Sequence, residues 1–149
     1  MIIGKVSNLR KRGIDEMKLN ELKDAIMKED FYETNAILEK ILENDNALAY
    51  VEPLINVIES NPEIDYGMPG PVIHFIENFP TEDYVEILLN SLKRKPTSHT
   101  LWMLNRIIND SPANKEEYIE VLYETSRRSD VEADIKETAK FFYEFQINS

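Results

Sequence analysis

The feature that most constrains the fold of this chain is an internal repeat of 34 residues. Three segments begin with tyrosine, a β-branched residue and glutamate, followed two residues later by leucine, and they start at Tyr50, Tyr84 and Tyr118. A fixed period of this length is typical of stacked helix pairs, in which each repeat buries its apolar face against the next. The tetratricopeptide repeat has the same length, but its Trp-Leu-Gly-Tyr signature is missing. The repeat therefore favours a HEAT-like stack.

Within the repeats, apolar residues recur with the period of an α-helix. Val51, Leu54, Ile55 and Ile58 follow the spacing i, i+3, i+4, i+7, which places them on one face of a helix. Long alternating runs that would indicate strands are absent from the sequence. Prolines and capping residues delimit eight predicted helices, at residues 15–28, 31–43, 48–60, 69–78, 81–94, 98–109, 111–127 and 130–146.

Three of the predicted boundaries depend on residues that favour helix ends. We expect Asp30 and Asp130 to cap the helices that follow them, because an aspartate side chain accepts a hydrogen bond from a free N–H of the first turn. We expect Ser111 and Pro112 to open the helix of the third repeat, since proline is best tolerated in a first helical turn.

The sequence thus predicts an all-α protein, a short HEAT-like α-solenoid of about eight helices in four antiparallel pairs, with an irregular α-bundle as the alternative. A length of 149 residues indicates a single domain, 1–149, in which the repeats start near residues 50, 84 and 118 and residues 1–13 form an N-terminal arm. The first apolar run covers residues 1–3, too short for a signal peptide, and no run is long enough to span a bilayer. We therefore expect a cytoplasmic protein without a membrane partner.

The repeat also arranges acidic residues. The chain carries 28 acidic and 17 basic residues, a net charge of −11, which disfavours nucleic acid as a partner. Glu52, Glu86 and Glu120 occupy equivalent positions beside the apolar stripe, and stacking would align them in an acidic rib. Each is followed one turn later by a polar residue, at Asn56, Asn90 and Glu124 respectively. The rib is a candidate surface for a basic protein, and a solvated helix flank that binds nothing is the alternative.

Glycine and proline are concentrated at residues 66–71, Tyr-Gly-Met-Pro-Gly-Pro. This segment lacks the spacing of the nucleotide-binding glycine loops, and no strand precedes it. Its prolines also remove backbone donors that a phosphate would need. We interpret it as an enlarged, stiff corner between two helices, on which Tyr66 and Met68 are exposed to a partner and Asp65 lies beside them.

Two histidines complete the candidate site residues. His74 and His99 fall in the early turns of consecutive second helices of the repeat, where stacking would bring them to one edge. Neither belongs to a helical metal-binding pair, the chain has no cysteine, and no serine lies in a Gly-x-Ser-x-Gly motif. We expect no catalytic activity, no metal and no cofactor; a metal site or an all-α hydrolase that uses both histidines is the remote alternative.

Two segments, Gly-Met-Pro-Gly-Pro-Val-Ile-His-Phe-Ile-Glu at residues 67–77 and His-Thr-Leu-Trp-Met-Leu-Asn-Arg-Ile-Ile-Asn-Asp at residues 99–110, resemble a family of small all-α, HEAT-like bacterial immunity proteins. They are separated by a helix that ends in Leu-Lys-Arg-Lys-Pro. The residues that carry the resemblance are Gly67, Pro69, Gly70, Pro71, His74, Phe75, Glu77, His99, Thr100, Trp102, Leu104, Asn105 and Arg106.

The resemblance implies a function that the residues alone do not give. Immunity proteins of this kind are encoded beside polymorphic or contact-dependent toxins and neutralise them by direct, stoichiometric binding in the cytoplasm of the producing cell. The expected partner is a cognate protein toxin, and a basic toxin would suit the acidic surface. The alternative is a HEAT-like adaptor or scaffold protein that binds other proteins.

Overall fold

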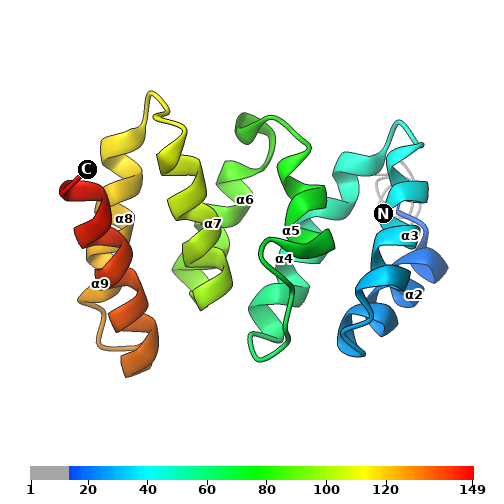
Figure 1. Cartoon of the computed structure of the whole chain (residues 1–149), viewed down its shortest axis with the longest axis horizontal. Helices are drawn as coiled ribbons and strands as arrows, with labels where there is room; N and C mark the ends of the chain where they lie inside the picture. The colour runs from blue at the N-terminus through cyan, green and yellow to red at the C-terminus, as the bar shows by residue number, and fades with distance from the viewer. Residues whose placement is uncertain (1–13) are drawn as a thin grey trace, which may run out of the picture. The chain divides into compact units, whose positions relative to one another are not determined.

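The computed structural model describes residues 14–149, and every regular element in that range is helical (Figure 1). The all-α prediction is therefore confirmed. The elements are α2 (Glu16–Met27), α3 (Phe31–Leu42), the 3-10 helix η1 (Ala47–Tyr50), α4 (Val51–Ser60), α5 (Gly70–Glu77), α6 (Thr81–Arg94), α7 (Ser98–Asn109), α8 (Lys115–Ser126) and α9 (Ala133–Ile147). The arm expected at residues 1–13 lies outside the described residues.

The chain forms two compact units. Among the described residues, the first consists of residues 14–57 and Glu63–Tyr84, and the second of Ile58–Pro62 and Val85–Ser149. Helices α4 and α6 each contribute residues to both units. The prediction of one domain with a continuous HEAT-like stack stays a prediction, and the two units are described separately.

In the first unit, α2 packs against α3 and α3 packs against α5. The Asp15 carboxylate caps α2 by accepting a hydrogen bond of 3.0 Å from the backbone N–H of Met17. The Asp30 carboxylate caps α3 in the same way, through the N–H of Glu33 at 3.0 Å, as predicted. Both caps stabilise helix starts on the surface, while the apolar faces of the helices supply the core.

In the second unit, α7, α8 and α9 pack against one another, and Figure 1 shows α9 alongside α8. Helix α7 has the predicted bounds because Thr97 and Thr100 form a reciprocal capping box at its start. Near the end of α9, the buried Gln146 amide donates to the side-chain oxygens of Asn105 and Asn109 at 2.7 and 2.8 Å. This amide cluster ties α9 to α7.

Equivalent positions of the repeat have equivalent environments. The three tyrosines that open the repeats are 1%, 4% and 7% exposed, and the three leucines four residues later are fully buried. The three glutamates between them are all exposed. The predicted orientation of the repeat helices, with one apolar face inward and the glutamate on the solvent side, is therefore confirmed for each helix by itself.

Two predicted helix starts are wrong. The backbone of Ser111 has φ of 52°, outside the helical region, and a turn closed by the Lys115 N–H on the Pro112 carbonyl precedes α8. The N-cap of α9 is Glu132, and the Asp130 side chain does not cap this helix. Both carboxylate oxygens of Asp130 accept hydrogen bonds from Arg128 instead. The third predicted helix begins as the 3-10 helix η1 and becomes α-helical at Val51.

Candidate functional site

A groove of about 250 Å³ lies between α6 and α8 in the second unit. These are the first helices of two successive repeats, and they line the groove with different faces. Four apolar or aromatic residues line its interior, Leu89 and Leu92 from α6 and Tyr118 and Val121 from α8. Leu92 and Tyr118 are buried, while Leu89 and Val121 are half-exposed, so a bound group could cover apolar surface there.

Carboxylates stand along the rim of this groove. Glu86 from α6 and Glu117 and Glu124 from α8 line it, and all three are exposed. Within residues 14–149, none of the ion pairs involves these three glutamates. Their negative charge is therefore available to a cationic group that enters the groove, over an apolar surface that lowers the local dielectric constant.

Two cations, one amide and the buried Thr125 complete the lining. Lys93 and Asn90 from α6 are exposed, and Arg128 is half-buried just beyond the end of α8. The guanidinium of Arg128 donates to both carboxylate oxygens of Asp130, at 2.9 and 2.8 Å, and to the Leu92 carbonyl at 2.9 Å. The hydrogen bond with Asp130 raises the pKa of Arg128, and the same bond lowers the pKa of Asp130. Arg128 is thus a fixed cation at one end of the groove.

The three glutamates of the predicted rib have different positions. Glu86 lines the groove, whereas Glu120 is exposed on α8 and does not line it. Glu52 is exposed on α4 in the first unit. The continuous rib stays a prediction, but the structure selects Glu86, and Glu124 from the next repeat, as the acids that share a concave surface.

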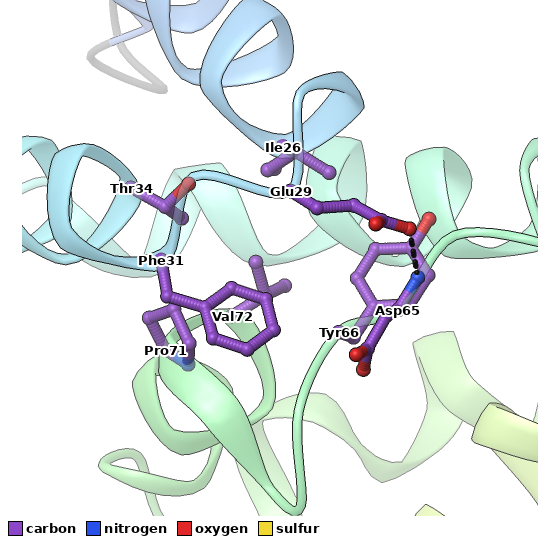
Figure 2. A pocket seen from close by; sticks show the side chains of 8 residues that line it. All are labelled: Ile26, Glu29, Phe31, Thr34, Asp65, Tyr66, Pro71 and Val72. Atoms are coloured by element: carbon purple, nitrogen blue, oxygen red, sulfur yellow. Dashed lines mark hydrogen bonds between the residues drawn. The ribbon is translucent and has the colours of Figure 1, made fainter.

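The loop between α4 and α5, residues 61–69, is longer than the equivalent connection at residues 95–97, as predicted. Figure 2 shows how it is held: the Asp65 N–H donates to a carboxylate oxygen of Glu29 at 2.8 Å. The Asp65 carboxylate in turn accepts a hydrogen bond of 2.9 Å from the N–H of Gly67. Gly67 has φ of 92°, and a Cβ at this position would lie 2.5 Å from the Cα of Gly70, so the corner requires glycine.

The expectation that Tyr66 is exposed on this loop is wrong. Its side chain is only 2% exposed, and its hydroxyl donates to the Val57 carbonyl at 3.3 Å. Burial raises the pKa of the Tyr66 phenol. The ring anchors the loop in the core because an aromatic side chain with a satisfied hydroxyl can bury a large apolar area. Met68, by contrast, is 87% exposed, as predicted.

A small crevice adjoins the anchored loop. Phe31, Pro71 and Val72 form one side of it and Glu29, Asp65 and Tyr66 the other (Figure 2). Its volume of about 10 Å³ is close to the minimum for one water molecule. This crevice is too small to bind a substrate or a peptide side chain.

The two histidines, His74 and His99, differ in exposure and in their contacts. His74 is exposed on α5 in the first unit. His99 is half-buried near the start of α7 in the second unit, and its Nε2–H donates to the Pro62 carbonyl at 3.0 Å. In the described range, no three histidine, aspartate or glutamate side chains are grouped closely enough to hold a metal ion. His99 therefore has a structural role in joining α7 to the end of α4.

One interaction was missed by the sequence analysis. Glu59, on α4, accepts hydrogen bonds from the Ser91 hydroxyl at 2.8 Å and from the guanidinium of Arg94 at 2.9 Å. Burial opposes ionisation of Glu59, but these hydrogen bonds outweigh it and lower its pKa. Glu59 and Ser91 are 32 residues apart, and no local pattern marks the pair. Arg94 belongs to the basic cluster Lys93-Arg94-Lys95, so part of that cluster serves the fold.

No protein-family model, curated protein or solved structure matches this chain. The helices in the described part of the chain also include none with the length and apolar character that crossing a membrane requires. The candidate site therefore rests on the geometry and charge of the groove.

Proposed function

We propose that this chain is a protein-binding module and that the α6–α8 groove holds a basic segment of its partner. The observation that supports this proposal is the combination of an apolar interior with three exposed carboxylates that form no ion pair among the described residues. A lysine or arginine of a partner can lay its aliphatic stem on Leu89 and Val121 while its charged end meets Glu86 or Glu124. The net charge of −11 accelerates the approach of a basic protein.

The proposed partner is a cognate bacterial toxin, which the chain neutralises stoichiometrically in the cytoplasm of the cell that produces both. This part of the proposal is supported by the resemblance of residues 67–77 and 99–110 to immunity proteins. The role is non-catalytic: the chain blocks the toxin by occupying its surface. An acidic blocker suits a toxin whose own substrate is an anion, because the same basic surface binds both.

Other candidate contacts extend the proposed interface beyond the groove. Met68 is an exposed apolar side chain on a loop that is held by the hydrogen bond from Asp65 to Glu29 and by the buried Tyr66 ring. Asp65 and His74 are exposed on the same unit. Because the backbone beside Met68 is already held, less backbone entropy is lost when a partner covers it, and Met68 is the strongest of these contacts.

A co-expression experiment tests the function. Cells that carry an inducible toxin domain, encoded immediately beside this gene, are expected to survive induction when the wild-type chain is present and to die without it. Glu86→Lys combined with Glu124→Lys is expected to abolish or strongly reduce the protection. Glu137→Lys combined with Glu144→Lys changes the net charge equally at exposed positions outside the groove, and this control is expected to protect.

Two outcomes would count against the proposal. If the wild-type chain does not bind or protect against the neighbouring toxin, but its groove binds a basic segment of another protein, the adaptor function replaces the immunity function. If both double variants protect as well as the wild type, the groove is not the binding surface.

A further inference from the structure

The first 13 residues and the rest of the chain have opposite charges. Residues 1–13, Met-Ile-Ile-Gly-Lys-Val-Ser-Asn-Leu-Arg-Lys-Arg-Gly, contain four basic residues and no acidic residue. Residues 14–149 hold all 28 acidic residues and the other 13 of the 17 basic residues, which gives them a net charge of −15. Because the chain links the two parts covalently, the acidic surface attracts its own basic segment.

The α6–α8 groove is an acidic part of that surface. Three carboxylates and two cations line it, namely Glu86, Glu117, Glu124, Lys93 and Arg128. The guanidinium of Arg128 is already paired with the carboxylate of Asp130. Lys93 is therefore opposed by three carboxylates, and a net charge of −2 remains in the groove. This charge is complementary to that of residues 1–13.

The negative charge is concentrated at one end of the groove. Glu86 lies in the first half of α6 and Glu117 in the first turn of α8. Toward the other ends of the two helices, Lys93 and Glu124 have opposite charges. A hydrogen bond from Arg128 to a carbonyl in the last turn of α6 shows that these ends are adjacent. A cation is therefore favoured between Glu86 and Glu117.

Residues 1–13 also match the apolar part of the groove. The dipeptides at residues 5–6 and 9–10, Lys-Val and Leu-Arg, each place an apolar side chain next to a cation. Leu89 and Val121, half-exposed in the groove, can be covered by these side chains and by the aliphatic stems of the cations. In the described residues, the basic clusters at 93–95 and 127–128 each supply one arginine to an ion pair instead.

We propose that residues 1–13 occupy the α6–α8 groove of their own chain until a partner displaces them. Their cations meet Glu86 and Glu117, and their apolar side chains cover Leu89 and Val121. This inference rests on the proposed function and adds to it a built-in competitor for the same site. A partner that offers only a basic segment gains little by replacing residues 1–13, so the competition favours a partner with further contacts.

The size of the effect follows from the covalent link. A short link gives the attached segment an effective concentration on the order of 1 mM. For a segment that binds with a dissociation constant of about 0.1–1 mM, the groove is accessible in only part of the molecules, and the apparent affinity for a competing ligand falls about 2–10-fold.

Neutralising the basic residues of the segment tests the proposal in the whole chain. The test variant combines four substitutions, Lys5→Ser, Arg10→Ser, Lys11→Ser and Arg12→Ser. The NMR signals of the Leu89 and Val121 methyl groups are expected to shift from their wild-type positions, because the groove empties. A synthetic peptide of residues 1–13 is expected to bind this variant about 2–10-fold more tightly than the wild type and to return the two signals toward their wild-type positions.

A second variant controls for net charge. It makes the same charge change at four exposed lysines outside the groove, Lys23→Ser, Lys28→Ser, Lys40→Ser and Lys140→Ser. At physiological ionic strength, where distant exposed charges are screened, this variant is expected to keep the wild-type methyl signals and to bind the peptide with nearly the wild-type affinity.

The outcomes separate this inference from the proposed function. If the test variant and the control give the same methyl signals and the same peptide affinity, residues 1–13 do not occupy the groove, while a groove for a basic partner remains. If the shift between the wild type and the test variant disappears on dilution, the segment comes from a second copy, which contradicts a contact within one chain. If the peptide shifts Leu89 and Val121 in none of the chains, both proposals fail.

Discussion

The α6–α8 groove and the loop at residues 61–69 use their polar groups in opposite ways. In the loop, the Asp65 backbone and carboxylate and the Tyr66 hydroxyl all form hydrogen bonds within the same unit. In the groove, Glu86 and Glu124 form no ion pair with any described residue. The two cavities also differ in volume: the crevice beside the loop has about 10 Å³ and the groove about 250 Å³.

A conspicuous sequence segment and a binding surface lie in different places in this protein. Glycines and prolines at residues 66–71 are conspicuous, yet they meet the steric demands of a tight corner that buries Tyr66. The groove comes from ordinary helix residues that recur every 34 positions. We infer that the loop mainly serves stability and the groove mainly serves binding.

The largest expected effect is on stability, at the anchor of the loop. Tyr66→Ala should lower the free energy of unfolding by about 3–5 kcal/mol, because it removes a buried aromatic side chain. Met68→Ala, two residues away at an exposed position, should change it by less than about 0.5 kcal/mol. Urea denaturation of both variants measures the difference. Equal stability of the two variants would contradict the assignment of Tyr66 as the anchor.

Glycine substitutions in the same loop should have intermediate effects. Gly67→Ala should cost roughly 1–3 kcal/mol, because φ of 92° strains an alanine and its Cβ would contact Gly70 at 2.5 Å. Gly70→Ala should lower stability less, because a Cβ at this position would meet nothing within 4 Å. Only the backbone strain from φ of 74° remains. Thermal unfolding ranks the two variants. A Gly70 variant less stable than the Gly67 variant would show that the close approach is not the limiting factor.

Charge reversal in the groove should affect binding and leave stability unchanged. Glu86→Lys combined with Glu124→Lys is expected to weaken binding of the toxin roughly tenfold at low salt, mainly through slower association. Glu137→Lys combined with Glu144→Lys is the control of equal charge. Surface plasmon resonance at two salt concentrations measures both pairs of variants. An equal loss in the control would mean that net charge, rather than the groove, drives binding.

The smallest predicted effect concerns the paired carboxylate of the second unit. The pKa of Glu59 is lower in the folded state than its ordinary value of 4.5. The ionised carboxylate therefore stabilises the fold at a pH above 4.5, and this stabilisation is lost as the pH falls through the lower pKa of the folded state. Arg94 is 49% exposed, so solvent screening limits the contribution to about 0.5 kcal/mol. Glu59→Gln should lower stability at pH 7 by about that amount, and the difference from wild type should shrink toward pH 3. A difference that is independent of pH would contradict this linkage.

Local chemistry made much of the fold predictable. The repeat and its apolar periodicity predicted the all-α class, and Asp30 and the segment Ser98–Asn109 behaved as their sequence indicated. The failures occurred where a distant or competing interaction decides the outcome. Asp130 is a good cap by type, but Arg128 engages both its oxygens. Ser111 takes a positive φ that delays α8.

The site was predictable only in outline. Periodicity identified Glu86 and Glu124 as solvent-side residues of successive repeats, but it could not show that α6 and α8 leave a groove between them or that Glu120 lies outside it. Tyr66 was placed on the surface because loop residues usually are. Its burial depends on the tertiary arrangement, which places Ile26, 40 residues away in the sequence, beside the same crevice.

The most direct test of the account is methyl NMR of the chain bound to the toxin. In the groove, Leu89, Leu92 and Val121 provide methyl probes, and in the loop the exposed Met68 provides another. If the groove is the binding surface, the methyl signals of the three groove residues shift on binding and Glu86→Lys combined with Glu124→Lys removes these shifts. A complex in which the Met68 methyl shifts while all three groove residues stay unchanged would contradict the account.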